Sequence, residues 1–95
     1  MLRNLRIGGY AISTAGHDAG RCYVIIDIEK EYVYLVDGII RTIDRPKKKK
    51  LKHVNLLKYF DPDLEEKIVN NKATNEVIKR AIKLLKDRNS SKEVE

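Results

Sequence analysis

The stretch Cys22–Gly38, CYVIIDIEKEYVYLVDG, contains the two clearest strand patterns of the chain. Apolar side chains alternate along Cys22–Ile28, and a run of β-branched and aromatic residues, Tyr32–Val36, follows a charged turn. Asp37 and Gly38 then predict a two-residue hairpin turn, because such turns need positive φ and glycine adopts it without penalty. The stretch therefore predicts an antiparallel sheet.

Three more short strands are expected around this pair. Tyr10–Ser13 precedes it across a loop of small residues, and Ile39–Asp44 returns from the hairpin. Pro46 ends that strand, and Leu51–Leu56 follows as a short fifth strand. Five short strands within about fifty residues favour a small, strongly bent barrel, because closure removes the exposed edges of a short sheet. The expected fold class is mainly β.

Two helices are expected after the barrel. Asp61 and Pro62 predict a helix start, with a carboxylate at the N-cap and proline at the first helical position. Thr74 is expected to cap a second helix that ends near Arg88 and has an apolar face at helical spacing. The predicted units are a barrel domain at residues 1–60, a helical appendage at 61–88 and a flexible polar tail at 89–95.

The net positive charge of the chain comes from one segment. Residues 1–40 carry four basic and five acidic side chains, residues 61–95 carry eight of each, and residues 41–60 carry eight basic against one acidic. Lys47–Lys50, within Arg41–Lys52 (RTIDRPKKKKLK), would repel one another if packed together, so they are expected to extend into solvent. The segment indicates a polyanionic partner, most often nucleic acid, with a solvated lysine-rich loop as the alternative.

Other function classes have no supporting pattern. The single cysteine, Cys22, excludes an internal disulfide and favours a reducing compartment. The two histidines lack the paired short spacing of a zinc site, and Ser13, His17 and Asp18 lie too close along one loop for a hydrolytic triad. No apolar run is long enough for a signal peptide or a membrane span. We therefore expect a cytoplasmic protein that is not an enzyme, with no metal, cofactor, membrane or small-molecule substrate.

Residues Gly9–Val36 resemble the KOW motif. An apolar strand is followed by Thr14-Ala15-Gly16, a short loop, Gly20 with the basic Arg21, and a second apolar strand. The later Val-Asp-Gly at 36–38 and Lys-His-Val-Asn-Leu at 52–56 are similar to the KOW ribosomal proteins of the archaeal and eukaryotic large subunit and to small bacterial relatives. Many KOW motifs have a further glycine after the basic residue, where this chain has Cys22 and Tyr23.

The resemblance implies an SH3-like five-stranded barrel that binds ribosomal RNA on the large subunit, with neighbouring ribosomal proteins as possible further partners. A phosphate can approach a glycine-containing loop closely, and lysine and arginine supply its counter-charge. The expected RNA-binding residues are His17, Arg21, Arg41, Arg45, Lys47, Lys48, Lys49, Lys50, Lys52 and His53. The expected structural loop glycines are Gly16, Gly20 and Gly38.

Two points stay open. The KOW motif also occurs in bacterial transcription elongation and antitermination factors, where the barrel often contacts protein, so a protein–protein module of a transcription elongation or translation factor is the alternative function. Lys79, Lys83 and Lys86 share one face of the second expected helix. Because Glu76 and Asp87 dilute that charge, a solvated face is favoured over a second RNA contact.

Overall fold

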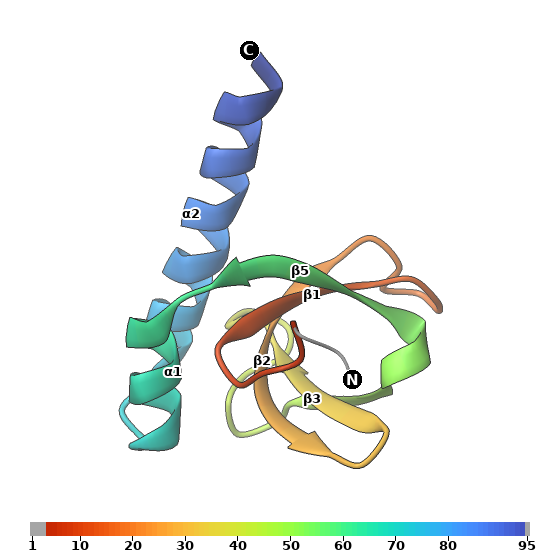
Figure 1. The fold of residues 1–95 in the computed structure, drawn as a ribbon. Coiled ribbons are helices and arrows are strands. Elements are labelled where there is room, and N and C mark those ends of the chain that lie inside the picture. Colours follow the sequence, from red (N-terminus) through yellow and green to blue (C-terminus); the bar gives the residue numbers. More distant parts are fainter. Residues whose placement is uncertain (1–3, 95) are drawn as a thin grey trace.

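The structure of the protein is a computed structural model, of which residues 4–94 are described (Figure 1). Five strands and a short 3-10 turn precede two helices, in agreement with a mainly β fold that ends in helices. The elements are β1 (Gly9–Ser13), β2 (Cys22–Glu29), β3 (Tyr32–Val36), β4 (Lys47–Lys50), η1 (Leu51–His53), β5 (Val54–Phe60), α1 (Pro62–Val69) and α2 (Asn75–Val94).

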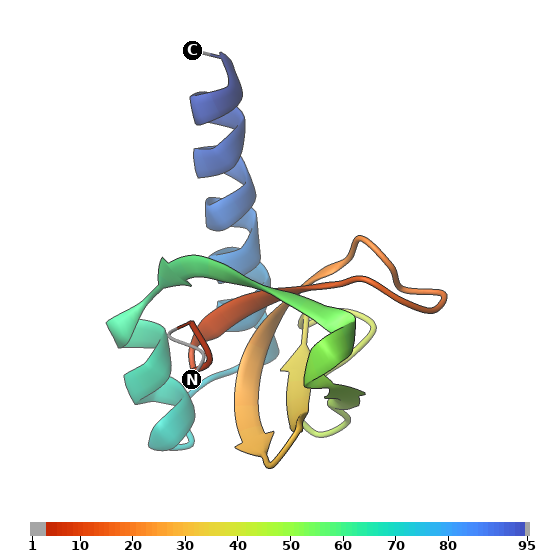
Figure 2. The same cartoon turned by 45° about the vertical axis from the view of Figure 1, so that its right-hand side comes forward.

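The five strands form one antiparallel sheet in the order β4-β3-β2-β1-β5. The sheet bends strongly, and η1 connects its two edge strands, β4 and β5 (Figures 1 and 2). Within residues 4–94 no ladder pairs β4 with β5, so the sheet is not closed into a barrel. β4 and β5 therefore remain edge strands, and the closure that was expected to remove the sheet edges is not seen in the described part of the chain.

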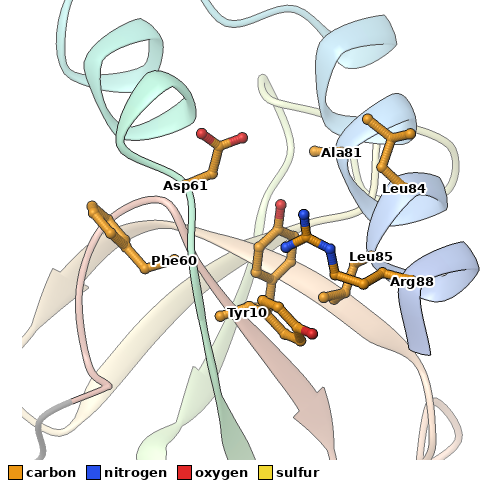
Figure 3. Close-up of a pocket in the computed structure, with 8 residues that line it drawn as sticks. Tyr10, Phe60, Asp61, Ala81, Leu84, Leu85 and Arg88 are labelled. Atoms are coloured by element: carbon orange, nitrogen blue, oxygen red, sulfur yellow. The ribbon is translucent and has the colours of Figure 1, made fainter. Parts of the chain in front are cut away.

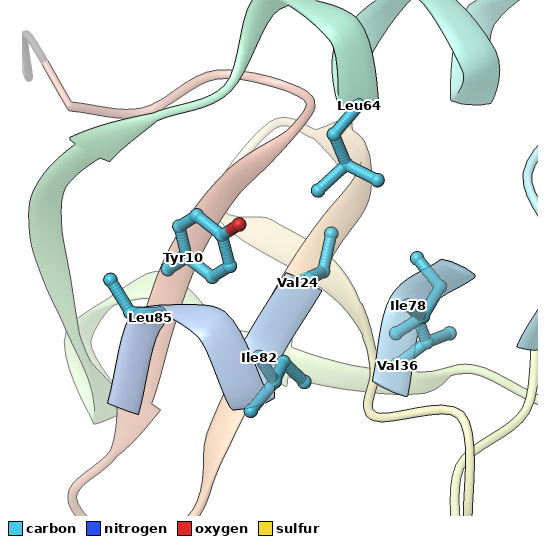
Figure 4. Close-up of a cluster of buried hydrophobic side chains, with 7 residues drawn as sticks. All are labelled: Tyr10, Val24, Val36, Leu64, Ile78, Ile82 and Leu85. Atoms are coloured by element: carbon cyan, nitrogen blue, oxygen red, sulfur yellow. The ribbon is translucent and has the colours of Figure 1, made fainter. Parts of the chain in front are cut away.

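Each face of the sheet carries its own apolar layer. One layer packs beneath the helices, where Tyr10, Val24 and Val36 of the sheet meet apolar side chains of α1 and α2 (Figure 4). The other layer is buried although no helix covers it, because the bent sheet encloses it. The enclosed layer consists of Ala11, Tyr23, Ile25, Val33, Leu35 and Val54. Burial of each aliphatic side chain contributes roughly 1.5–3 kcal/mol to the free energy of folding. The buried side chains of α1 and α2 therefore make the helices part of the core.

A bulge in β2 changes which face its last residues occupy. Alternation places Cys22, Val24 and Ile26 on the helix side and Tyr23 on the enclosed side, as the sequence pattern predicts. The pairing with β3 then shifts register between Ile25 and Asp27. Ile28 therefore packs with the enclosed layer, although strict alternation would place it on the helix side.

The expected fourth strand at Ile39–Asp44 is wrong. The Asp37 carboxylate accepts hydrogen bonds from the backbone N–H groups of Ile39 and Arg41, both at 2.9 Å, and closes a turn over residues 37–41. This turn replaces the expected two-residue hairpin. The Asp37 side chain satisfies backbone N–H groups that would otherwise pair with a neighbouring strand. The chain rejoins the sheet only at β4, which is the lysine run itself.

The expected fifth strand at Leu51–Leu56 is displaced. Leu51–His53 forms the 3-10 turn η1, whose first N–H donates to the Glu31 carbonyl at 2.7 Å. The strand runs from Val54 to Phe60 and pairs with β1. The turn is needed because the chain must cross from one edge of the bent sheet to the other.

Both predicted helix starts are confirmed. Asp61 Oδ1 accepts from the Asp63 N–H at 3.0 Å with proline at the first helical position, and Thr74 Oγ1 accepts from the Val77 N–H at 3.2 Å. α2 does not end near Arg88, however, but continues to Val94, and residue 95 lies outside the described part. The flexibility expected of residues 89–95 stays a prediction. No glycine or proline follows Arg88 to end the helix.

The last turns of α2 extend beyond the sheet in both views (Figures 1 and 2). Between residues 4 and 94, no helix is both long and apolar enough to cross a membrane.

Candidate nucleic-acid interface

Two lysines of β4 point to the inner side of the bent sheet, where Lys49 is buried and Lys47 is partly buried. Lys49 is only 8% exposed, and its Nζ donates to Asp18 Oδ1 at 2.8 Å and to the Ala15 carbonyl at 2.7 Å. Lys47 Nζ lies 3.4 Å from Asp18 Oδ2. The expectation that the whole run Lys47–Lys50 extends into solvent is therefore wrong, because a buried carboxylate compensates the charge of this inner pair.

The other two lysines of β4 lie on the outer side of the sheet. Lys48 Nζ is 3.5 Å from Glu29 Oε1 and 4.5 Å from the centre of the Tyr32 ring. Lys50 Nζ is 4.0 Å from Glu31 Oε1. Because successive residues of a strand point to opposite faces, four consecutive lysines separate into two pairs, and each pair meets acidic groups. Much of the charge that the sequence concentrates here is thus balanced inside the fold.

Asp18 is the centre of the inner cluster. It also accepts hydrogen bonds from Ser13 Oγ at 2.9 Å and Tyr23 Oη at 2.8 Å. Burial by itself would raise the pKa of this carboxyl, but the hydrogen bonds from Lys49, Tyr23, Ser13 and Lys47 outweigh it and hold the pKa well below its usual range. Burial and the bond to Asp18 raise the pKa of Tyr23 to about 12. Asp18 is therefore ionised at neutral pH and links the β1–β2 loop to β4.

The β1–β2 loop satisfies several of its own backbone donors. Gly16 and Gly20 have φ of +86° and +91°, which explains the choice of glycine at both positions. The N–H groups of Ala19, Gly20 and Arg21 donate to carbonyls of residues 16, 13 and 18. Because these donors are occupied, a phosphate that approached the loop would meet the Arg21 side chain more readily than a cluster of free backbone N–H groups.

The remaining expected RNA-binding residues lie on three segments. His17 and Arg21 are exposed on the β1–β2 loop, and Lys52 is exposed on η1 beside the half-buried His53. The Thr14 N–H donates to the His53 carbonyl at 2.9 Å, which joins η1 to the loop. The connection from β3 to β4 carries Arg41 and Arg45, and it is tied to the start of α2 by the bond from Ile43 N to Asn75 Oδ1 at 2.9 Å.

A groove of about 470 Å³ separates the start of β2 from α2. We call it the basic groove, because four of its side chains are cationic and only Asp37 is acidic. Positions 79, 83 and 86 follow the spacing that keeps side chains on one side of a helix, and Arg21 reaches the groove from the β1–β2 loop. The lining residues are Arg21, Cys22, Asp37, Ile39, Lys79, Ile82, Lys83 and Lys86.

Packing of α2 against the sheet brings its lysine face close to Arg21. Ile78 and Ile82 are buried against Val24, so the adjoining lysine face of the helix runs beside the start of β2. The sequence indicated the lysine spacing but not the element that the face would meet, and it favoured a solvated face. Only the docking of α2 brings these lysines to the loop arginine that the KOW resemblance singles out.

Cys22 lines the basic groove and is partly buried. Burial raises the pKa of its thiol, and the positive charge of Lys86 acts against that rise without cancelling it. The thiol is therefore protonated and slow to react at neutral pH, as expected for a small packing residue.

A second hollow, of about 420 Å³, lies where β5 ends and α2 passes (Figure 3). Arg88 extends over aromatic rings there, with its guanidinium carbon 5.4 Å from the centre of the Tyr59 ring. Burial and the nearby Asp61 raise the pKa of Tyr10 to about 12. The hollow combines aromatic walls with one acid and one base, so it differs in character from the basic groove.

Comparisons with known proteins assign the chain to no family. No protein-family model matches the chain, and no curated protein is significantly similar to it. Among the residues that the structure describes, no group of three His, Cys, Asp or Glu side chains could hold a metal ion.

Proposed function

We propose that this protein binds structured RNA through the basic groove, and that ribosomal RNA of the large subunit is the target. The observation that carries the proposal is the meeting of Arg21 with Lys79, Lys83 and Lys86 in one groove that contains a single carboxylate. The KOW-like sequence of the adjoining loop supports ribosomal RNA as the particular polyanion.

The chemistry of the groove suits phosphates better than bases. Lysine acts as a point charge that attracts phosphate with little base specificity, whereas arginine can bind phosphate with two parallel N–H groups. Arg21 lies 3.9 Å from Asp37 Oδ2 and remains half exposed, so it keeps donors for a phosphate. The Asp37 side chain is only 13% exposed, but 3.9 Å is near the limit for an ion pair, so the contact leaves guanidinium N–H groups free to bind a ligand.

The lysine strand has a different role in this proposal. Lys49 and Lys47 position the β1–β2 loop through Asp18, and the loop in turn presents Arg21 at the groove. Lys48, Lys50 and Lys52 are left at the surface as secondary contacts, and they raise the positive potential around the molecule. The expected RNA-binding set is thereby divided into residues that build the loop and residues that meet the ligand.

The proposal is tested by measuring binding of the protein to large-subunit ribosomal RNA as a function of salt. About four phosphate contacts predict that the logarithm of the association constant falls with the logarithm of the salt concentration with a slope of about −3. The native protein is also expected to sediment with the large subunit at moderate salt. A nearly flat salt dependence, or sedimentation only as the free protein, would contradict the proposal.

A second candidate function rests on the hollow shown in Figure 3. Its aromatic walls and the 59% exposed Leu84 could receive an apolar side chain of a partner protein, as in a transcription elongation or translation factor. Affinity capture in the presence of nuclease distinguishes the two candidates. Retention of a specific protein favours this one, and it should be lost on Leu84→Glu while RNA binding is unchanged.

A further inference from the structure

The turn at residues 37–41 carries two adjacent exposed isoleucines at the margin of the basic groove. Ile39 is 70% exposed and Ile40 is 61% exposed, and Ile39 is also one of the side chains that line the groove. Single exposed apolar residues are ordinary, but two at the tip of one turn beside a row of cations form a defined surface feature. We call this pair the isoleucine tip.

The isoleucine tip is held rigidly by its own backbone. Asp37 Oδ1 accepts from both the Ile39 and Arg41 N–H groups, and the N–H groups of Asp37 and Gly38 both donate to the Arg41 carbonyl, at 2.9 and 3.1 Å. Gly38 has φ of +82°, and a Cβ at this position would overlap the carbonyl oxygen of Asn75. The turn is therefore closed internally and pressed against the start of α2.

The same carboxylate joins the tip to the groove. Asp37 Oδ1 organises the turn, whereas Asp37 Oδ2 lies 3.9 Å from the Arg21 guanidinium. Asp37 therefore contacts both the turn that carries the isoleucine tip and the cation that we propose binds phosphate. A ligand that places a phosphate beside Arg21 would bring its neighbouring groups toward Ile39.

We propose that the isoleucine tip is an apolar wedge that packs against an unstacked base of an RNA whose phosphates lie in the basic groove. This inference rests on the proposed RNA-binding function. Apolar side chains such as isoleucine insert between bases in many nucleic-acid complexes, and an unpaired base lowers the free energy needed for unstacking. The preferred substrate class is therefore a helical RNA with a bulge or another unpaired nucleotide.

The charges around the tip favour nucleic acid over other apolar partners. A groove lined by Arg21 and three lysines complements a run of phosphates. Two isoleucine side chains bury too little apolar surface to anchor a protein stably in a membrane. The wedge and the groove together match the two parts of a nucleotide, the base and the phosphate.

The test uses two RNA hairpins, one with a fully paired stem and one with the same stem and a single bulged adenosine. Wild-type protein is expected to bind the bulged hairpin about five- to tenfold more tightly, because an isoleucine gains burial only against the unstacked base. The double variant Ile39→Ser, Ile40→Ser is expected to bind both hairpins with the wild-type affinity for the paired one. Its salt dependence should be unchanged.

Two controls separate the wedge from the groove. The double variant should keep the wild-type melting temperature, because both side chains are largely exposed. Lys83→Ala combined with Lys86→Ala should weaken binding to both hairpins by the same factor and leave the preference for the bulge intact.

The outcomes are distinguishable. If wild-type protein binds the two hairpins equally and with a steep salt dependence, the wedge is overturned and the proposed function stands. The same holds if the preference for the bulge survives in the double serine variant. Absence of RNA binding, or binding that ignores salt, overturns both. If the serine variant instead loses binding to phosphatidylserine vesicles while keeping the bulge preference, the tip serves a membrane surface and the wedge is wrong.

Discussion

Lys49 Nζ lies 2.8 Å from Asp18 Oδ1 in the interior of the bent sheet. The most basic run of the sequence therefore supports the β1–β2 loop through its inner pair, Lys47 and Lys49, and does not simply extend into solvent. The cations that face a common open groove come instead from that loop and from α2. The cations that support the loop and the cations that line the groove are therefore expected to respond differently to substitution.

Lys49→Met should destabilise the fold. The substitution keeps the apolar stem of Lys49 but removes the closest donor to the buried Asp18 carboxylate. Ser13, Tyr23 and Lys47 remain as donors, so we expect a loss of about 2–3 kcal/mol in the free energy of unfolding, measured by urea denaturation. Lys48→Met removes an exposed lysine of the same strand and should leave the urea midpoint unchanged. Equal midpoints for the two variants would contradict the structural role of Lys49.

Asp18 should dominate the acid sensitivity of the fold. Its folded-state pKa is held well below the unfolded value of about 3.9, so its stabilising effect is complete above that pH and is lost as the pH falls below it. We expect the unfolding free energy of the wild type to drop more steeply between about pH 4 and pH 2 than that of Asp18→Asn. Parallel pH profiles for the two proteins would show that Asp18 is not the group responsible.

Gly38 and Gly20 both have positive φ, but their surroundings differ. A Cβ at Gly20 would find no heavy atom within 4 Å, so Gly20→Val should lower stability through backbone strain alone, by about 1–2 kcal/mol. Gly38→Ala adds an overlap with Asn75 to the strain and should lower stability by about 3 kcal/mol or more. Thermal unfolding of both variants gives the comparison. A Gly38→Ala protein as stable as wild type would refute the tight packing of the turn on α2.

Bound RNA should shield Cys22. The thiol lines the basic groove and is the only one in the chain, so alkylation reports on this single place. We expect saturating ribosomal RNA to slow alkylation of the native protein by about fivefold or more, as followed by mass spectrometry. In denaturant the rate should not depend on RNA. An unchanged rate in a demonstrably RNA-bound protein would place the interface elsewhere.

The local patterns of the sequence were sufficient for much of the fold. Alternation in Cys22–Ile28, the aromatic run Tyr32–Val36 and the caps at Asp61 and Thr74 depend on near neighbours, and each predicted its element. The lysine strand could not be predicted in this way. Repulsion between consecutive lysines is visible in the sequence, whereas the compensating Asp18 comes from a loop some thirty residues away and is brought there only by folding.

The candidate site also depends on contacts between residues that are far apart in the sequence. Arg21 was identified by its place in a KOW-like loop, and Lys79, Lys83 and Lys86 were recognised as one helix face. Their meeting depends on how α2 docks through Ile78 and Ile82, which no local pattern specifies. A turn governed by Asp37 likewise replaced the expected strand, because one side chain bonding two N–H groups outweighed the β-propensity of Ile39 and Ile40.

The most direct test of the central claim compares two variants that remove the same charge from different surfaces. Arg21→Ala, Lys83→Ala and Lys86→Ala together remove three cations of the basic groove, whereas Lys58→Ala, Lys67→Ala and Lys72→Ala remove three exposed lysines outside it. Affinity for large-subunit ribosomal RNA is measured across a range of salt concentrations. We predict that the groove variant loses about two to three units of salt slope and most of its affinity, while the second variant stays close to wild type. Equal losses in both would mean that binding follows net charge alone, which would contradict a defined interface in the groove.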